Sequence, residues 1–529
     1  MKGWRTLARW AGGTSAVALL LALVDPNAGG LDGFWAYAGM SALCAALLAG
    51  GWLWLGRPAA SRELGAALAV AVALRLIVAF GLPHLLPAYG NPEEHHRAGY
   101  FLPDAWARDR HAWNLQRSGQ PLWIALSEPA RSDQYGGLLF LGALAYRAFS
   151  PEEHRPVLPA MPGLAVSALG VLFAWHFANL FGRRAARLAA WVMALHPEAL
   201  LLTAGLMREP YLITAVAATF AGYAGARQHG LRAGLPMALV GIGLTVWISP
   251  PYAVLLLGLA GLAWIWEGRG APRASIWVLS GIGALALVMI VVTARAWVGS
   301  GAASGSSPIE VIGRWLTDGA RYELSKQFTA SGWVQEIFRQ TPEWAWFPLA
   351  TLNGLVQPFL PATLLDRTVI PLMRLILIAR ALGWFVLLPF LLYAPLAAFG
   401  RAGWRSLPAF LSLAVWGTAI LAAYRLAGDQ WDSVRARTVF LALQAALAGW
   451  AWSWALARRS PWLGRMAILV GGPTLVFMHW YAGRYYQTPK LSLWGTLAAS
   501  GAFVGLCLAW WGARAAWGKR RLTERSPGV

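Results

Sequence analysis

The residues best suited to chemistry in this chain lie in one charged and aromatic stretch, 100–119. The stretch holds two carboxylates, Asp104 and Asp109, while most of the surrounding sequence is apolar. A carboxylate at the water-facing mouth of a membrane cavity can act as a general base and take the proton from a hydroxyl nucleophile. We therefore take Asp104 and Asp109 as the candidate catalytic residues.

A short helix is expected to carry these two residues. Pro103 favours a helix start and Gly119 favours its end. Asp104 is then placed to cap the first turn, and Arg108, four residues later, lies on the same face and can pair with it. A purely structural role for Asp104, as a cap and ion-pair partner, therefore stays open beside the catalytic one.

The composition of the chain is that of a membrane protein. Its 529 residues are 58% hydrophobic and only 13% charged, with a mean hydropathy of +0.50, whereas soluble domains carry about 25% charged residues. The two cysteines, Cys44 and Cys507, both lie in apolar runs and are expected to pack there rather than to form a disulfide framework. We expect an all-α polytopic membrane protein.

The net charge of +21 could suggest a nucleic-acid partner, but the positive-inside rule accounts for the same excess through cytoplasmic arginines. On this basis we expect no nucleic acid, a location in the cell (inner or plasma) membrane, and cytoplasmic N- and C-termini. Only Glu63, Glu267 and Glu524 of the 23 acidic residues then fall inside. The candidate site is thus expected on the extracytoplasmic side.

Apolar runs long enough to cross a bilayer predict about 13–14 transmembrane helices. The expected spans are 11–24, 34–56, 64–82, 157–180, 185–204, 209–226, 233–248, 252–266, 274–297, 370–398, 407–424, 434–457, 466–481 and 491–512. Basic residues precede the first run, which we interpret as a retained helix rather than a cleaved signal peptide.

Three parts are expected along the chain. They are 1–63 with two N-terminal transmembrane helices, 64–457 as the catalytic module, and 458–529 with C-terminal transmembrane helices and a basic cytoplasmic tail. The module contains a large first extracytoplasmic loop, 83–156, in which 136–149 suits an interfacial helix. A second outer segment, 299–366, ends in an apolar stretch from residue 344 that prolines break, which indicates a re-entrant or interfacial path.

Four outer stretches carry a resemblance to a known family: 104–119, 132–139, 196–210 and 428–437. In order they provide an Asp-containing helix in the first loop, interfacial helices, an Arg-Glu pair and a late arginine motif. This order resembles the GT-C membrane glycosyltransferases over roughly residues 60–450. It is most similar to the family of the protein O-mannosyltransferases and the lipid A aminoarabinose transferase (glycosyltransferase family 39-like).

The resemblance implies a GT-C-like fold and direct transfer, with inversion, of a sugar from a polyprenyl-phosphate donor to a protein, lipid or glycan acceptor in the cell envelope. The roles that follow are base for Asp104, supported by Asp109; acceptor or donor positioning for Asp133, Tyr135, Arg208 and Glu209; and lipid-phosphate binding for Arg435 and Arg437. A planar guanidinium suits a phosphate because it donates two hydrogen bonds at once. Plain structural roles also fit, since Glu209 can favour a helix dipole and the late arginines can snorkel to the interface.

Two other functions remain open: a transporter or flippase for lipid-linked saccharides, and an inactive GT-C-like scaffold. The polar first loop argues against a transporter, whose key polar groups would gather near the bilayer midplane. Ala105 and Arg108 stand where many family members have Glu and Tyr, which is the reason to keep the inactive scaffold. We predict no metal site, because the adjacent His95 and His96 have poor ligand spacing, and no certain cofactor, although a divalent cation is possible.

Overall fold

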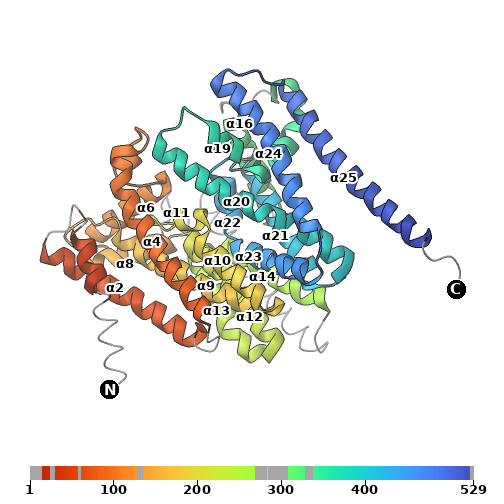
Figure 1. The fold of residues 1–529 in the computed structure, drawn as a ribbon. Helices are drawn as coiled ribbons and strands as arrows, with labels where there is room; N and C mark the ends of the chain where they lie inside the picture. The colour runs from red at the N-terminus through yellow and green to blue at the C-terminus, as the bar shows by residue number, and fades with distance from the viewer. Residues whose placement is uncertain are drawn as a thin grey trace.

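The computed structural model describes residues 13, 15–23, 25, 30–56, 61–127, 133, 135–268, 283, 308–327 and 338–524. Helices joined by short connections make up these ranges, and no β-strand occurs within them. Figure 1 shows most of the helices packed in one bundle, with α25 (Leu493–Glu524) extending from its edge.

The helices fall into three groups along the chain. The first long helices are α2 (Leu31–Gly51), α4 (Arg62–Tyr89), α9 (Met161–Ala178), α10 (Arg183–Leu195), α12 (Glu209–His229), α13 (Leu231–Ile248) and α14 (Pro250–Glu267), and the short α11 (Pro197–Leu201) follows α10. Between α4 and α9 lie the shorter α5 (Glu94–Arg97), α6 (Pro103–Arg117), α7 (Ile124–Ser127) and α8 (Gly137–Phe149). The later helices are α16 (Pro308–Gln327), α18 (Trp346–Val356), α19 (Leu360–Leu365), α20 (Pro371–Ala397), α21 (Leu407–Arg425), α22 (Asp432–Thr438), α23 (Leu441–Ala457), α24 (Trp462–Tyr486) and α25.

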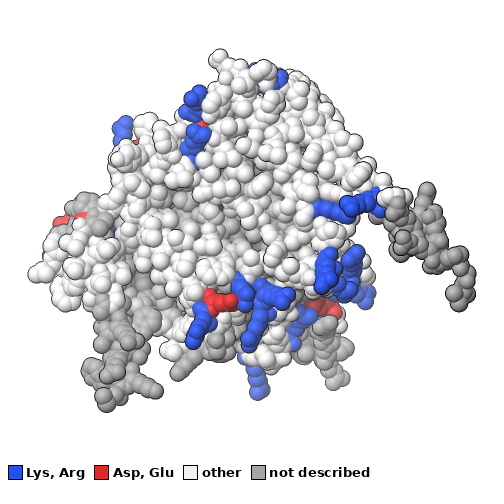
Figure 2. All heavy atoms as spheres, in the orientation of Figure 1, with Lys and Arg blue, Asp and Glu red and all other residues white. Residues whose placement is uncertain are grey.

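Nine helices within the described ranges are long and apolar enough to cross a membrane. The pair α22 and α23 makes a tenth span if this pair, which is bent by 67°, is counted as one. Figure 2 shows a broad band without charge across the middle of one face, with Lys and Arg gathered along its lower edge. The chain is therefore an all-α polytopic membrane protein, as its composition predicts.

The number of spans differs from the expected 13–14. Two expected spans, 11–24 and 274–297, lie largely outside the described residues. The expected span 185–204 is wrong, because the chain breaks there into α10 and α11: the residue before Pro197 is forced out of helical geometry, and His196 has a ψ of 117°. The range 209–226 is helical in α12, but this helix is not among the nine apolar ones.

Two expected short elements are present. The range 136–149, expected as an interfacial helix, forms α8, an apolar helix of 13 residues that is too short to cross a bilayer. The broken stretch expected over 344–366 consists of α18 and α19, which are separated near Pro358. Both regions add short helices to the ends of the long ones.

Helix ends define the two ends of the bundle. The helices α5 to α8 lie where α4 stops and α9 starts, and α12 also begins at this end. At the opposite end, Arg187 at the start of α10 pairs with Glu63 at the start of α4 at 2.5 Å. Arg227 near the end of α12 likewise pairs with Glu267, the last residue of α14, at 2.9 Å.

A buried arginine ties three helices together between these ends. Arg75 of α4 is fully buried, and its guanidinium donates to the Ser167 hydroxyl of α9 at 2.9 Å and to the Met193 carbonyl of α10 at 3.0 Å. Its third bond goes to the carbonyl of Ala71, one turn earlier. Met193 lies in the last turn of α10, where free carbonyls and the negative end of the helix dipole favour a cation. Arg75 therefore fixes the end of α10, just before the break that leads to α11.

Candidate functional site

Arg435 of α22 joins three carboxylates that are far apart in the sequence. Its Nη2 donates to Asp104 Oδ2 at 2.9 Å and to Glu209 Oε1 at 3.0 Å, and its Nη1 donates to Asp432 Oδ1 at 2.9 Å. Arg108 and Arg208 lie close enough to interact electrostatically with Glu209. We call these six residues, Asp104, Arg108, Arg208, Glu209, Asp432 and Arg435, the Arg435 cluster. It assembles α6, α12 and α22 at one end of the bundle.

Asp104 enters the cluster from the first turn of α6. The expected helix is confirmed, since α6 spans Pro103–Arg117 and Gly119 follows it with a φ of 69°. The expected capping role of Asp104 is wrong, because the N-cap is Leu102 and Asp104 is the second helical residue. Its carboxylate instead faces Arg435 and, at 3.5 Å, Arg108.

The surroundings of Asp104 keep its carboxylate ionised. Burial raises the pKa of Asp104, but the charges of Arg435 and Arg108 outweigh it, and the net pKa is lower than the usual value. The side chain still has 44% of its surface exposed, whereas that of Glu209 has 10%. Asp104 is therefore an anionic carboxylate that outside molecules can reach, which a general base requires.

Glu209 is the buried carboxylate of the cluster. It is the first residue of α12, so its charge also favours the positive end of the helix dipole. Its Oε1 accepts from both Nε and Nη2 of Arg435, at 3.3 Å and 3.0 Å. Its Oε2 is buried and has no hydrogen-bond partner among the described residues.

Arg208 differs from the other two arginines of the cluster. It is half-buried, and its guanidinium forms no hydrogen bond or ion pair with any residue that the structure describes. Arg108, by contrast, is buried against Met207, whose sulfur lies 3.2 Å from Nη1. Burial lowers the pKa of Arg108, and the nearby positive charge of Arg208 lowers it further. Two arginines thus lie near each other, and one of them, Arg108, forms an ion pair with Asp104.

Asp109 lies outside the Arg435 cluster, in a separate buried network. Its carboxylate is fully buried and accepts from the hydroxyls of Tyr100 at 2.5 Å and Tyr146 at 2.7 Å, and His154 Nε2 lies at 2.6 Å. Burial and the charge of Asp109 raise the pKa values of both tyrosines well above the usual value. The structure therefore places Asp109 where it joins α6 to α8 and to the loop after α8.

Asp133 and Tyr135 lie beside the start of α8. Asp133 is fully buried, and its Oδ2 accepts from the backbone N–H groups of Leu138 and Leu139 at 3.0 Å and 2.9 Å. These are first-turn donors that a helix cannot satisfy itself, so Asp133 stabilises the start of α8. Tyr135 is half-buried, two residues before this helix.

The contacts of Arg437 do not match the phosphate-binding role expected for it. The residue is buried, and its guanidinium donates to the backbone carbonyls of Gly354 at 3.3 Å, Leu355 at 3.4 Å and Gln357 at 2.6 Å. It also lies 3.6 Å from the ring centre of Trp384. These contacts hold the connection between α18 and α19 and occupy the donors that a phosphate would need.

Sequence reasoning missed a second buried ion pair beside the cluster. Arg380 of α20 donates to both oxygens of Glu198, at 2.5 Å and 3.1 Å, and lies over the ring of Trp431 at 4.1 Å. Trp431 directly precedes α22 and contacts Phe101, three residues before Asp104, with ring centres 5.7 Å apart. The sequence did contain a signal for this pair, because Arg380 lies inside the apolar run 370–398. A charge is costly there, so an acidic partner is expected.

Asp432 was likewise not singled out. It lies three residues before Arg435 on α22, a spacing that places two side chains together on a helix. Asp429 holds the start of this helix, since its Oδ1 accepts from the N–H groups of Trp431 and Asp432, each at 2.7 Å. The helix spacing was readable in the sequence, but the partners from α6 and α12 were not.

Within the part of the chain that the structure describes, one group of side chains could hold a metal ion: the ligand atoms of Glu93, His95 and His96 lie within 4.8 Å of one another. His95 Nε2 is 3.2 Å from Glu93 Oε2, and His96 Nδ1 accepts from the N–H of Asn91 at 2.9 Å. Because that bond occupies the lone pair of His96 Nδ1, Nε2 carries the proton in neutral His96 and offers no lone pair. The arrangement fits a metal poorly, and we assign none to it.

Comparisons with known proteins give a distant structural likeness. No family model matches the chain, and no curated protein matches it. The chain is similar to the crystal structure of the Archaeoglobus fulgidus oligosaccharyltransferase in complex with Zn and sulfate, with a TM-score of 0.41 and 17% sequence identity. The match covers 80% of this chain and 53% of that one, so it spans about half of the archaeal protein. At this TM-score, the likeness assigns neither a family nor an activity.

Proposed function

We propose that this protein is a membrane glycosyltransferase of the GT-C type whose active site is the Arg435 cluster. In this proposal it moves a sugar from a polyprenyl-phosphate donor to a protein, lipid or glycan acceptor on the extracytoplasmic side. The observation that supports it is the meeting of an exposed ionised carboxylate with several arginines at one end of a membrane bundle. Group transfer from a phosphate requires a base for the nucleophile and positive charge for the departing phosphate, and a carboxylate and arginines provide these.

The reaction assigns a separate task to each charge. Asp104 takes the proton of the acceptor hydroxyl while the acceptor oxygen bonds to the anomeric carbon. The bond from that carbon to the phosphate oxygen breaks, and its electron pair leaves with the lipid phosphate. Arg435 keeps the Asp104 carboxylate in place through the 2.9 Å bond.

The phosphate role, expected for Arg435 and Arg437, fits Arg208 and Arg108 better. Arg435 is already surrounded by three carboxylates, and Arg437 donates to three backbone carbonyls. Arg208 has its donors unused among the described residues, and Arg108 lies beside it. A guanidinium with free donors can bind a phosphate without first breaking an ion pair.

The test is transfer of radiolabelled sugar from polyprenyl-phosphate donors to membrane-extract acceptors by the purified full-length protein. We expect Asp104→Asn to lower the rate at least 100-fold, since general-base catalysis contributes about 10² to 10⁴. Glu63→Gln is the matched control, because it removes the carboxylate of a half-exposed ion pair at the opposite end and should leave transfer unchanged.

Two outcomes would contradict the proposal. If Asp104→Asn retains the full rate, Asp104 is not the base. If the wild-type protein transfers no sugar from any donor but moves labelled lipid-linked saccharide across vesicle membranes, the protein is a transporter and the enzyme assignment fails.

A further inference from the structure

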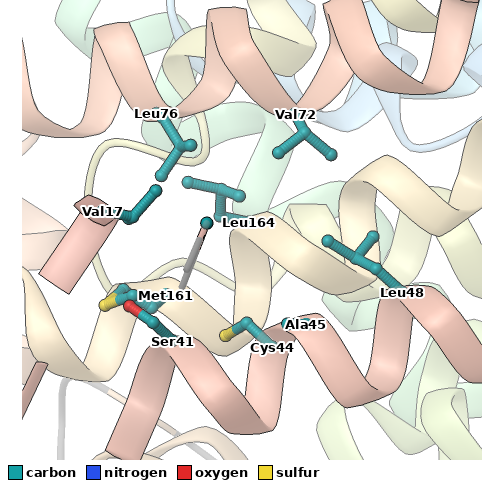
Figure 3. Close-up of a pocket in the computed structure, with 10 residues that line it drawn as sticks. Val17, Ser41, Cys44, Ala45, Leu48, Val72, Leu76, Met161 and Leu164 are labelled. Atoms are coloured by element: carbon teal, nitrogen blue, oxygen red, sulfur yellow. The ribbon is translucent and has the colours of Figure 1, made fainter. Parts of the chain in front are cut away.

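A cavity lies among the N-terminal helices, away from the Arg435 cluster. It has a volume of about 380 Å³ and opens between α2, α4 and α9, next to Gly13 and Val17 of the N-terminal segment. Figure 3 shows Ser41, Cys44 and Ala45 of α2 on one side of it and Val72 and Leu76 of α4 on the other. It shares no lining residue with the Arg435 cluster.

The chemistry of the described lining favours an apolar ligand. None of the described lining residues is charged, and the walls are mainly aliphatic, including Leu48, Met161 and Leu164. The side chains that break this apolar surface are the hydroxyl of Ser41 and the thiol of Cys44. Ligand sites that are apolar with one fixed polar group select for shape and for a single polar contact.

The Ser41 hydroxyl is the feature that points to a ligand. Ser41 is only 5% exposed, and its Oγ has no hydrogen-bond partner among the described residues. A serine within a helix usually bonds a carbonyl of the preceding turn, and several hydroxyls of this chain do so, as Ser412 does to Pro408 at 2.8 Å. An unsatisfied hydroxyl in apolar surroundings is costly, so a partner is expected within the cavity.

Leaving the cavity empty or filling it with water would both cost free energy. Lining atoms without neighbours lose dispersion contacts, and that loss grows with the cavity volume. A buried water needs two to four polar partners, which this lining does not provide. A hydrocarbon group is the occupant that restores the lost contacts.

The depth of the cavity identifies the part of a lipid that can reach it. Ser41 lies at the middle of α2 (Leu31–Gly51), ten residues from its start. At 1.5 Å per residue this is about 15 Å, or half of a hydrocarbon core of about 30 Å. A lipid head group remains at the interface, so only its chain extends to this level.

We propose that this cavity binds one unsaturated hydrocarbon chain of a bilayer lipid, with Ser41 donating a weak hydrogen bond to a double bond of the chain. A saturated chain fills the same volume but offers the hydroxyl no π electrons. Isoprenoid lipids and phospholipids with cis-unsaturated acyl chains share the required chemistry. This site does not depend on the proposed glycosyltransferase activity.

Photo-crosslinking of the purified full-length protein tests the site. The probes are three diazirine lipids: an isoprenoid alcohol, a phospholipid with an oleoyl chain and the same phospholipid with a saturated chain. We expect crosslinked peptides from α2, α4 and α9, with stronger labelling by unsaturated probes. The isoprenoid and oleoyl arms show which lipid source the site prefers.

Two neighbouring alanines provide a matched pair of variants. Ala45 lines the cavity and Ala46 is exposed on another face of α2. Ala45→Phe should lower labelling of the cavity peptides at least tenfold, and Ala46→Phe should leave it unchanged. Leu164→Trp is the second filling variant if Ala45→Phe does not fold.

Ser41→Ala tests the hydroxyl itself. It should reduce the preference for unsaturated over saturated chains by roughly twofold to fivefold, the effect expected of a weak hydrogen bond to π electrons. Equal labelling of both alanine variants would overturn the site. Equal labelling of wild-type protein by saturated and unsaturated probes would overturn the role of Ser41.

Discussion

Replacing Arg435 by glutamine tests whether the Arg435 cluster is held together by this one cation. Arg435→Gln keeps a polar side chain of similar length but removes the charge that three carboxylates share. The partners are not equivalent. Asp104 and Asp432 each have 44% of their side-chain surface exposed, while Glu209 has 10%. Most of the loss in stability is therefore expected to come from leaving Glu209 unpaired.

The magnitude follows from this difference in exposure. An exposed ion pair contributes about 0.2–1 kcal/mol, so Asp104 and Asp432 together account for no more than about 2 kcal/mol. Removing one partner of a buried pair costs about 3–5 kcal/mol, because the other charge stays buried without compensation. Arg108 and Arg208 lie near Glu209 and compensate for part of this loss. We expect the free energy of unfolding to fall by about 3 kcal/mol.

The assay is equilibrium unfolding in mixed micelles, monitored by far-UV circular dichroism at pH 7. The double variant Arg435→Gln/Glu209→Gln should recover most of the loss, since it leaves no buried charge unpaired. Arg435→Lys should fall between wild type and glutamine because it keeps the charge but not the forked geometry. A loss below about 1 kcal/mol for Arg435→Gln, or no recovery in the double variant, would refute the reasoning.

Three other predictions use the same physical terms. Arg380→Met should lower the unfolding free energy by about 3–5 kcal/mol, and Arg380→Met/Glu198→Gln should lower it by less, measured in the same micelle assay; equal losses would argue against a buried pair. Nearby arginines lower the pKa of Asp104, so kcat/KM of sugar transfer should fall on the acid side only at a pH below the usual aspartate pKa of about 3.9. Arg108→Met should move this fall to higher pH, because it removes one of the charges that lower the pKa. A pH profile unchanged by Arg108→Met would contradict the assignment. Gly222→Ala should destabilise by about 1–3 kcal/mol, because the added Cβ would lie 2.5 Å from the backbone N of α13, whereas Gly243→Ala, with open space around it, should cost little; similar melting temperatures for the two variants would contradict this close packing.

Much of the fold could be predicted from the sequence because lipid imposes simple rules. Long apolar runs identify spanning helices without any knowledge of their neighbours, and ten of the expected ranges lie in apolar helices or in the bent pair α22 and α23. The failure at 185–204 has a readable cause, since Pro197 disfavours helical geometry in the residue before it. Apolarity shows where a helix can lie, and proline shows where it must stop.

The site could be predicted only in part, because the sequence does not show what each helix face meets. Asp104 and Arg435 meet, but Asp109 and Arg437 lie in other environments. At 100° per residue, Asp109 lies about 140° around α6 from Asp104, whereas Arg108 is only about 40° from it. Helix geometry therefore separates the two acids, while the partners of Arg435 depend on long-range packing that no local pattern records.

The charge balance of the Arg435 cluster bears on how a phosphate donor could bind. The cluster contains three arginines and three carboxylates, but the ion pairs are shared unequally: Arg435 holds all three acids, and Arg208 holds none among the described residues. A donor phosphate that replaced a carboxylate on Arg435 would release Asp104, the proposed base. A phosphate on Arg208 pairs with an arginine that has no ion-pair partner among the described residues, and it leaves the bond from Arg435 to Asp104 intact. If Arg435 holds the base and Arg208 binds the phosphate, Arg208→Gln should raise KM for the lipid donor about tenfold or more and leave Asp104 in place. An unchanged KM would instead assign phosphate binding to Arg435.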